Sequence, residues 1–247
     1  MSNGLVLDKN GNKMSKRLGN AVDPFSTIEK YGSDPLRWYM ITNASPWDNI
    51  KFDIDGIEEV RRKFFGTLYN TYSFLLCTRT WMASTTPIRM WNGASVRRLT
   101  VGSFSVEQLG EGCGWLLGGL RATRAGRAIS DFVNDNLSNW YVRLNRRCFW
   151  GGGMTEDKLS AYQTLYTCLE TVAKLMAPIA PFYADQLFCD LIAVTGRETV
   201  ESVHLSDFPK YDEALIDKDL EERMKMAQDV SSMVLALRRK VNIKVRQ

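Results

Sequence analysis

The sequence predicts a mainly α-helical fold preceded by a short α/β segment. Two observations predict it: apolar residues recur at helical spacing over most of the chain after residue 53, and strand and turn signals are concentrated before it. The 247 residues allow one large domain or two small ones, and the 45% that are hydrophobic can form a substantial core. We therefore expect one domain over residues 1–53 and another over residues 54–247.

The first segment begins with a short apolar strand, Leu5–Leu7, and an Asn-Gly turn, which tolerates a positive φ. Two Asp-Pro pairs follow, at Asp23 and Asp34. Aspartate caps a helix well and proline fits its first position, so each pair predicts a helix start. Gly32 is expected to end the first of these helices.

Helices dominate the rest of the chain. The one expected over residues 54–74 depends on apolar residues three or four positions apart, which are Ile57, Val60, Phe64, Leu68 and Tyr72. The others are expected over residues 128–150, 158–176, 181–194 and from Asp217 or Asp219 to about Lys240. Residues 241–245 alternate as a strand does.

Residues 75–122 have an unusual composition. They contain no Lys, Asp or Tyr, yet they hold seven of the 18 glycines. The glycine spacing fits no phosphate-binding loop, and no helical or strand period holds over this stretch. We expect it to be poorly ordered, with accessible thiols at Cys77 and Cys113, whereas Cys148, Cys168 and Cys189 are protected on helices.

The composition excludes several classes of protein. A single histidine, His204, cannot supply a two-histidine metal site, and the five scattered cysteines include no CxxC pair. No apolar stretch is long enough to span a membrane. We therefore expect reduced thiols, no metal site and a cytoplasmic location. The net charge of +4 allows a polyanionic partner without requiring one.

A basic loop, Lys13-Met14-Ser15-Lys16-Arg17, carries the clearest functional signal. Alone it would be a solvated turn. With the preceding strand and turn, and the Leu-Gly-Asn and Asp-Pro helix start that follow, it resembles the end of the Rossmann-type catalytic domain of class I aminoacyl-tRNA synthetases. The resemblance implies catalytic roles for Lys13 and Lys16, and ATP contacts from Lys16, Ser15 and Met14. Arg17 stands where many members have serine.

The chemistry of that family explains the residue types. Aminoacyl-adenylate formation is an in-line attack on the α-phosphate of ATP, which comes with Mg²⁺, and it expels pyrophosphate. Negative charge develops on phosphoryl oxygens, and two lysines on a mobile loop offset it. Gly11 and Gly19 flank the loop and are expected to act as its hinges.

Three segments of the second half resemble the anticodon-binding helix bundle of isoleucyl-tRNA synthetases. They are Asn136–Arg147 with the following Phe149 and Trp150, Lys174–Phe182, and Val203–Leu205. Valyl-tRNA synthetases share the loop and the bundle, but their corresponding helix usually lacks this arginine pattern. Isoleucine is therefore favoured over valine.

The resemblance implies that Asn139, Arg143 and Arg146 contact tRNA, since residues three or four apart share one helical face. The alternative is a solvated face on which these arginines pair with Asp131 and Asp135. We expect Phe132, Trp140 and Leu144 to pack inside.

The family also suggests an origin for residues 75–122. Reading residues 76–83, 95–103 and 106–116 out of frame permits strings such as LYANVDG, RPEIDRWI and LNSLVKDVDG. The first two are what the family carries there, and the third is a sensible amphipathic helix. We expect this segment to be the product of a frameshift.

The implied function is that of a ligase which activates isoleucine with ATP and transfers it to tRNA(Ile), as a monomer. The family's HIGH-type histidine pair is missing, so we expect this chain to be an internal piece of a longer enzyme and inactive alone. The alternatives are an anticodon-binding module without catalysis and a piece of a valyl-tRNA synthetase.

Overall fold

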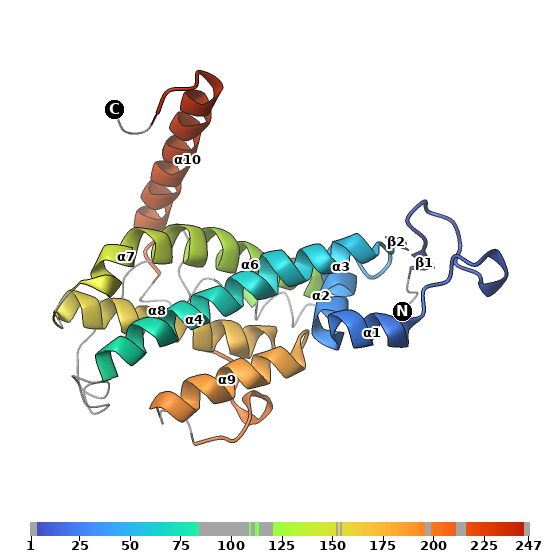
Figure 1. Ribbon diagram of the computed structural model, residues 1–247, viewed down its shortest axis with the longest axis horizontal. Helices are drawn as coiled ribbons and strands as arrows, with labels where there is room; N and C mark the ends of the chain where they lie inside the picture. The colour runs from blue at the N-terminus through green and yellow to red at the C-terminus, as the bar shows by residue number, and fades with distance from the viewer. Residues whose placement is uncertain are drawn as a thin grey trace.

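The computed structural model shows a helical bundle with a small α/β extension at one end (Figure 1). It describes residues 4–83, 109, 112–113, 121–151, 153, 155–195, 199–210 and 216–244. The predicted mainly α fold is confirmed. Within the described residues the strands are confined to one two-stranded pair.

The α/β extension is built around that strand pair. β1 (Val6–Leu7) and β2 (Ile50–Lys51) run parallel, with Val6 opposite Ile50. The intervening chain forms a 3-10 turn, η1 (Lys16–Leu18), and two helices, α1 (Pro24–Tyr31) and α2 (Ser33–Asn43). The predicted start of α1 is confirmed, because the Asp23 carboxylate accepts hydrogen bonds from the N–H groups of Phe25 and Ser26.

The start of α2 differs from the prediction. The helix begins at Ser33, so Asp34 lies inside its first turn and does not cap it. The Asp34 carboxylate instead accepts a hydrogen bond of 2.6 Å from the N–H of Tyr183, in the first turn of a helix much later in the chain. Asp34 therefore serves a helix on which it does not lie.

A long helical run crosses the bundle after residue 53. It consists of α3 (Ile54–Val60), a π-helical turn η2 (Arg61–Phe65) and α4 (Gly66–Ala83). The five apolar residues that predicted it are all buried or half-buried.

The run continues past Phe74, where the prediction ended it, because residues 75–83 are helical. Leu109 and Cys113 are buried in the core. The expectation of an accessible thiol at Cys113 is therefore wrong. Residues 84–108, on which most of the expected disorder falls, lie outside the described residues.

The helix that carries the arginine pattern begins at Ala122, six residues before the prediction. It is divided into α6 (Ala122–Asp131), a π-helical stretch η4 (Phe132–Val142) and α7 (Arg143–Trp150). Phe132 is buried as expected and Trp140 is half-buried. Leu144, expected inside, is 61% exposed. The predicted α-helical period fails here because a π turn takes up more residues than an α turn and shifts the register.

Three further helices complete the described chain. They are α8 (Glu156–Met176), α9 (Pro181–Thr195) and α10 (Lys218–Lys240), with a 3-10 turn η5 (Val203–Leu205) after α9. The strand expected at residues 241–245 is wrong as far as it is described, because Val241 and Asn242 form a turn. Residue 245 lies outside the described residues.

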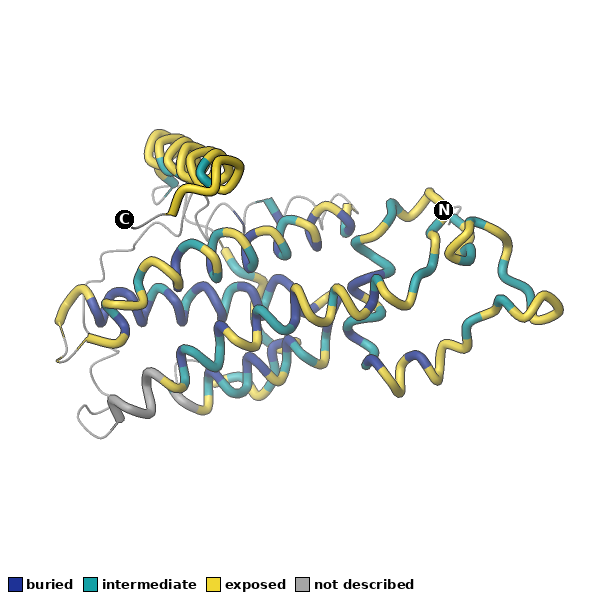
Figure 2. The backbone as a smooth tube through the Cα atoms, turned by 45° about the horizontal axis from the view of Figure 1, so that its top comes forward, coloured by how far each residue is buried: buried dark blue, intermediate teal, exposed yellow. Residues whose placement is uncertain are grey.

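The core lies between the inner faces of α4, α6, α8 and α9 (Figure 2). α8 is its centre, with buried side chains on every turn. α10, by contrast, projects from the bundle and is exposed along nearly all of its length (Figures 1 and 2). In the part of the chain that the structure describes, no helix is long and apolar enough to cross a membrane.

α2 joins the α/β extension to the bundle. Its Trp38 stacks on Phe64 with ring centroids 4.3 Å apart, and its indole N–H donates to the Ser130 hydroxyl of α6 at 3.1 Å. Two arginines strengthen this connection by donating to backbone carbonyls near helix ends. Arg37 donates to Ile179, and Arg127 donates to Thr42. These contacts fix the segment bearing the basic loop against the bundle.

Candidate functional site

The basic loop is held in shape by the side chain of Asn20. The amide oxygen of Asn20 accepts from the Ser15 N–H at 2.8 Å. Its amide nitrogen donates to the Asp8 carboxylate at 3.0 Å and to the Lys13 carbonyl at 3.3 Å. One side chain thus ties Lys13 and Ser15 of the loop to the turn that precedes them. Asn20 stood in the sequence pattern as part of Leu-Gly-Asn, but only the fold shows this role.

Asp8 organises the Asn-Gly turn on the other side of this contact. Its carboxylate accepts from the N–H groups of Asn10 and Asn12, at 3.0 and 2.7 Å. Gly11 has a φ of 89°, as the turn was predicted to require. The hydrogen bond from Asn20 is the main cause that lowers the pKa of Asp8, and the backbone N–H of Asn12 adds to it. Asp8 therefore stays ionised beside the loop.

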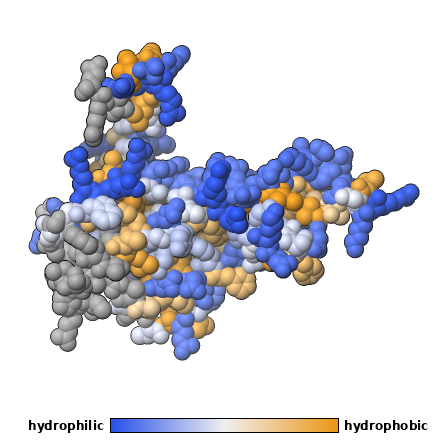
Figure 3. Space-filling model, in the orientation of Figure 1, coloured by the Kyte–Doolittle hydropathy of each residue, from blue (hydrophilic) through white to orange (hydrophobic). Residues whose placement is uncertain are grey.

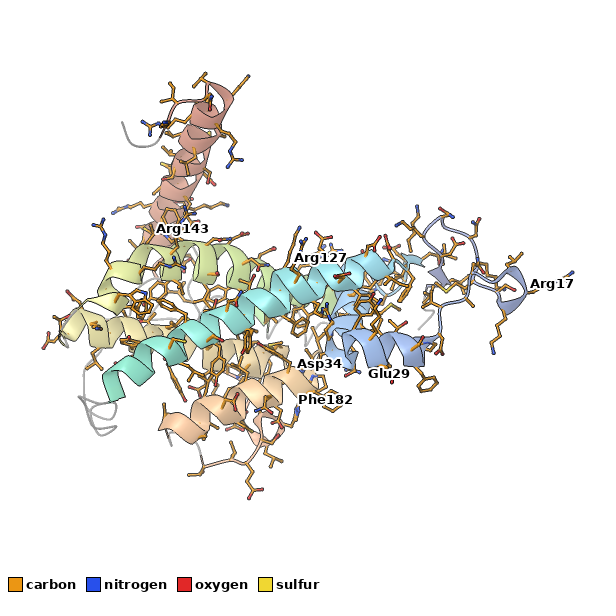
Figure 4. The ribbon with its side chains drawn as sticks, viewed as in Figure 1. Arg17, Glu29, Asp34, Arg127, Arg143 and Phe182 are labelled. Carbon is orange, nitrogen blue, oxygen red and sulfur yellow. The ribbon has the colours of Figure 1, made fainter. Side chains whose placement is uncertain are left out.

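The loop presents its cations to solvent. Lys13, Lys16 and Arg17 are exposed, and Figure 4 shows Arg17 at the far tip, away from every helix of the bundle. The Ser15 hydroxyl accepts from the N–H of Arg17, which leaves its own O–H to donate. Met14 is half-buried. The loop ends at Gly19, whose φ of 68° favours glycine.

The predicted tRNA-binding residues lie on one exposed face of the bundle. Asn139, Arg143 and Arg146 are all exposed, and they follow one another at about one helical turn. Within the described residues no carboxylate forms an ion pair with either arginine. The alternative, in which Asp131 and Asp135 neutralise this face, therefore has no contact to support it.

These two groups of residues form separate sites. Figure 4 shows Arg17 of the loop at the far right tip and Arg143 of the bundle face far from it, below α10. The loop lies beyond α1, whereas Arg143 begins α7, near the base of α10 (Figure 1). No single small molecule could touch both.

The described residues hold no group of three or more His, Cys, Asp or Glu side chains that could bind a metal ion. His204 lies in η5, where its Nε2 is 3.2 Å from the Pro181 carbonyl. This contact joins η5 to the start of α9.

Comparison with known families matches both sites. Residues 107–247 match the family model described as the anticodon-binding domain of tRNA ligase. This chain belongs to that anticodon-binding family. Residues 1–53 match a second model, that of class I tRNA synthetases for I, L, M and V. The two matches contain the arginine face and the basic loop respectively.

Several curated relatives share the sequence of this chain at high identity. The isoleucine--tRNA ligase of Bacteroides fragilis is 69% identical over 261 residues, which cover 100% of this chain and 22% of the relative. That of Porphyromonas gingivalis is 62% identical over 258 residues, covering 100% of this chain and 21% of the relative. That of Clostridium acetobutylicum is 40% identical over 251 residues, covering 99% and 24%. The chain thus spans about a fifth of the length of these Bacteroides and Porphyromonas relatives.

Solved structures show the same fold at low identity. A leucyl-tRNA synthetase from Agrobacterium radiobacter, in a ternary complex with tRNA and LeuAMS, has a TM-score of 0.59 at 19% identity and covers 87% of this chain and 24% of its own. Mycobacterium tuberculosis methionyl-tRNA synthetase with methionyl-adenylate has a TM-score of 0.56 at 19% identity, covering 83% and 43%. The fold of this chain is therefore that of part of a class I synthetase.

Proposed function

We propose that this chain supplies the ATP-contacting loop and the anticodon-binding bundle of an enzyme that joins isoleucine to tRNA(Ile). The single observation that carries the proposal is the basic loop, held by Asn20 and presenting two lysines, within a chain 69% identical to an isoleucine--tRNA ligase. The same relatives favour isoleucine over valine. We further propose that the complete enzyme acts as a cytoplasmic monomer.

The loop serves the first chemical step. The carboxylate of isoleucine attacks the α-phosphorus of ATP, a new carboxyl–phosphate bond forms, and the bond to pyrophosphate breaks. Lys16 and Lys13 offset the charge that develops on the phosphoryl oxygens and the leaving pyrophosphate. The Ser15 O–H, free to donate, fits a phosphate oxygen, while half-buried Met14 supports the loop from beneath.

Magnesium accompanies the nucleotide in this proposal. The residues of the loop fit a nucleotide that already carries its metal, because they offer cations and a hydroxyl rather than carboxylates. Its residues are therefore suited to phosphate oxygens and leave the metal to the nucleotide. Magnesium, when bound, would supply further neutralisation of the phosphates.

The bundle serves the second substrate. Asn139, Arg143 and Arg146 lie exposed on one face, and their side chains form no hydrogen bond or ion pair within the described residues. Guanidinium groups bind phosphates and position an RNA, while an amide can donate to and accept from base edges. We assign these three residues to the anticodon loop of tRNA(Ile).

A second function fits this chain taken alone. Its single histidine cannot form the histidine pair with which the family binds ATP. The 247 residues by themselves therefore act as an RNA-binding module without catalysis, and the ligase activity belongs to a chain that also contains the rest of the catalytic domain.

Binding of tRNA(Ile) to the purified chain tests the bundle. Affinity should fall steeply with salt, because phosphate contacts release counterions. Replacing Arg143 and Arg146 together by alanine should weaken binding and flatten the slope of log affinity against log salt by about 2, one for each lost phosphate contact.

The control variant replaces Arg62, an exposed arginine on η2. Arg37 and Arg127 are not suitable as controls, because their side chains donate to backbone carbonyls. Unchanged affinity and slope in the double variant would place both arginines outside the RNA contact.

A further inference from the structure

α7 carries a row of four exposed side chains along one face. Arg143, Arg146, Arg147 and Trp150 lie at positions i, i+3, i+4 and i+7, so they are neighbours on the helix surface. α7 contains no acidic residue. Within the described part of the chain the three guanidinium groups have no ion pair or hydrogen bond. The row is thus a concentration of uncompensated positive charge ending in an indole.

Trp150 makes one aromatic contact and otherwise remains largely exposed. Its ring meets Phe74 in an edge contact, with centroids 6.3 Å apart and planes at 70°. Phe74 in turn packs edge-on against buried Phe149. Trp150 nevertheless remains 55% exposed. An indole that is fixed by one aromatic contact and otherwise exposed is a rigid platform, which loses little conformational entropy when a flat ligand stacks on it.

Arginines elsewhere in the chain have side chains that hold the fold together. Arg37 donates to the carbonyls of Ile179 and Pro178, and Arg127 donates to those of Thr42 and Asn43. Both hold helix ends together. The arginines of α7 make no such contact, so their positions are not explained by the packing of this fold.

We infer that this face of α7 binds an unpaired stretch of RNA, with Trp150 stacking on a base and Arg147 joining Arg143 and Arg146 on the phosphates. The inference rests on the proposed function and deepens it, because it names a stacking residue and a further phosphate contact. Aromatic rings that take up splayed bases beside cations that follow the backbone are the usual means of binding single-stranded RNA.

The chemistry of the row favours unpaired RNA over other polyanions. In a duplex the bases already stack on one another, so their faces are not available to an indole. An acidic peptide would satisfy the guanidinium groups but would leave the exposed indole without a planar partner. Only unpaired nucleotides use both parts of the row.

Two RNA probes separate these contributions. One is the anticodon hairpin of tRNA(Ile), with its unpaired loop, and the other is a blunt duplex with the sequence of its stem. For the full 247-residue chain, Trp150→Ala should weaken hairpin binding on the order of 10-fold and leave duplex binding and the salt slope unchanged. Trp150→Phe should retain most of the affinity. Arg147→Ala should weaken both probes and lower the salt slope by about 1.

Trp47 offers the matched control, since it is 68% exposed but lies just before β2, outside the bundle. Trp47→Ala should bind both probes as the parent chain does. Equal losses on hairpin and duplex for Trp150→Ala would make Trp150 a packing residue and overturn the stacking role, as would no loss on either. A parent chain that binds neither RNA would overturn the proposed RNA-binding function itself, which is a different result.

Discussion

The carboxylate of Asp34 on α2 accepts a hydrogen bond of 2.6 Å from the N–H of Tyr183 in the first turn of α9. It thereby satisfies one of the backbone donors that a helix start leaves without an intrahelical partner, and its charge suits the positive end of the helix. Three residues on, Arg37 donates to Ile179 just before α9. One turn of α2 therefore holds the start of α9 with two side chains, the acidic Asp34 and the basic Arg37.

Removing the Asp34 cap should destabilise the bundle. Asp34→Ala leaves the Tyr183 N–H without its acceptor, and a lost cap costs about 1–2 kcal/mol. Asp34→Asn keeps an acceptor oxygen at the same place and should cost less. Urea unfolding followed by circular dichroism measures both. If the two variants lose equal stability, the hydrogen bond to α9 is not what Asp34 contributes.

The pH dependence of stability in the parent chain and in Asp34→Asn gives a second prediction. Burial raises the pKa of Asp34 above its ordinary value of 3.8, although the Tyr183 N–H and the Arg37 charge oppose this. The unfolded chain then ionises first, so the part of the stability that comes from this pKa difference is complete below pH 3.8 and is lost as the pH rises through the raised pKa. Asparagine does not titrate. The stability of Asp34→Asn relative to the parent should therefore increase as the pH rises above about 4, and a constant difference would contradict the raised pKa.

Local signals in the sequence were sufficient for much of the fold. The cap at Asp23 and the apolar period from Ile57 to Tyr72 involve residues within a few positions of one another, and both are confirmed. The basic loop was recognisable for the same reason. The role of Asp34 could not be predicted this way. It is followed by proline just as Asp23 is, but its carboxylate accepts from the N–H of Tyr183, which lies 149 residues later in the chain.

The candidate site shows the same division. Leu144 was expected inside because a uniform helical period was assumed across η4, whereas a π-helical stretch shifts that register. Asn20 and Trp150 belong to the sequence patterns that resemble the family, but those patterns do not indicate their individual roles. Their roles depend on contacts with Asp8 and Phe74, and only the folded chain brings these together.

Thiol labelling of the native chain should follow burial. Cys77 is exposed, whereas Cys113 and Cys168 are buried. Burial also raises the pKa of Cys113 to about 11, so little of the reactive thiolate is present at neutral pH. Mass spectrometry after a short reaction should find Cys77 labelled first, and Cys113 and Cys168 last. Fast labelling of Cys113 would contradict its place in the core.

The frameshift proposed for residues 75–122 is tested on the gene. Resequencing should find a compensating pair of an insertion and a deletion around this segment, which restores a frame containing the family's residues. The helix over residues 75–83 does not decide the matter, because both readings of a short stretch can be helical. Codons that allow no such pair would end the hypothesis.

Asn20→Ala should loosen the basic loop. The substitution removes the contacts of Asn20 with Ser15, Lys13 and Asp8, while the hydrogen bonds between Asp8 and its own turn remain. Limited trypsin digestion should then cut after Arg17 faster than in the parent chain. Asn10→Ala, an exposed change in the same turn, is the control and should not alter the rate. Equal rates in all three proteins would show that Asn20 does not limit loop opening.

Lys16→Ala should slow adenylate formation more than it weakens ATP binding. The test needs a complete catalytic domain, which the Bacteroides fragilis ligase provides when residues 1–53 of this chain replace its own matching stretch. The Lys16 ammonium matters most once charge develops on the leaving pyrophosphate, so isoleucine-dependent ATP–pyrophosphate exchange should fall roughly 10²–10³-fold in kcat with little change in KM for ATP. Lys13→Ala should act on the same step. The loss of kcat in the double variant should be smaller than the product of the two single losses, because both lysines offset one charge.

Arg17→Ser, at the loop tip, is the matched control and should retain activity. A rise in KM for ATP with unchanged kcat would make Lys16 a ground-state binding residue and contradict its proposed role in the transition state.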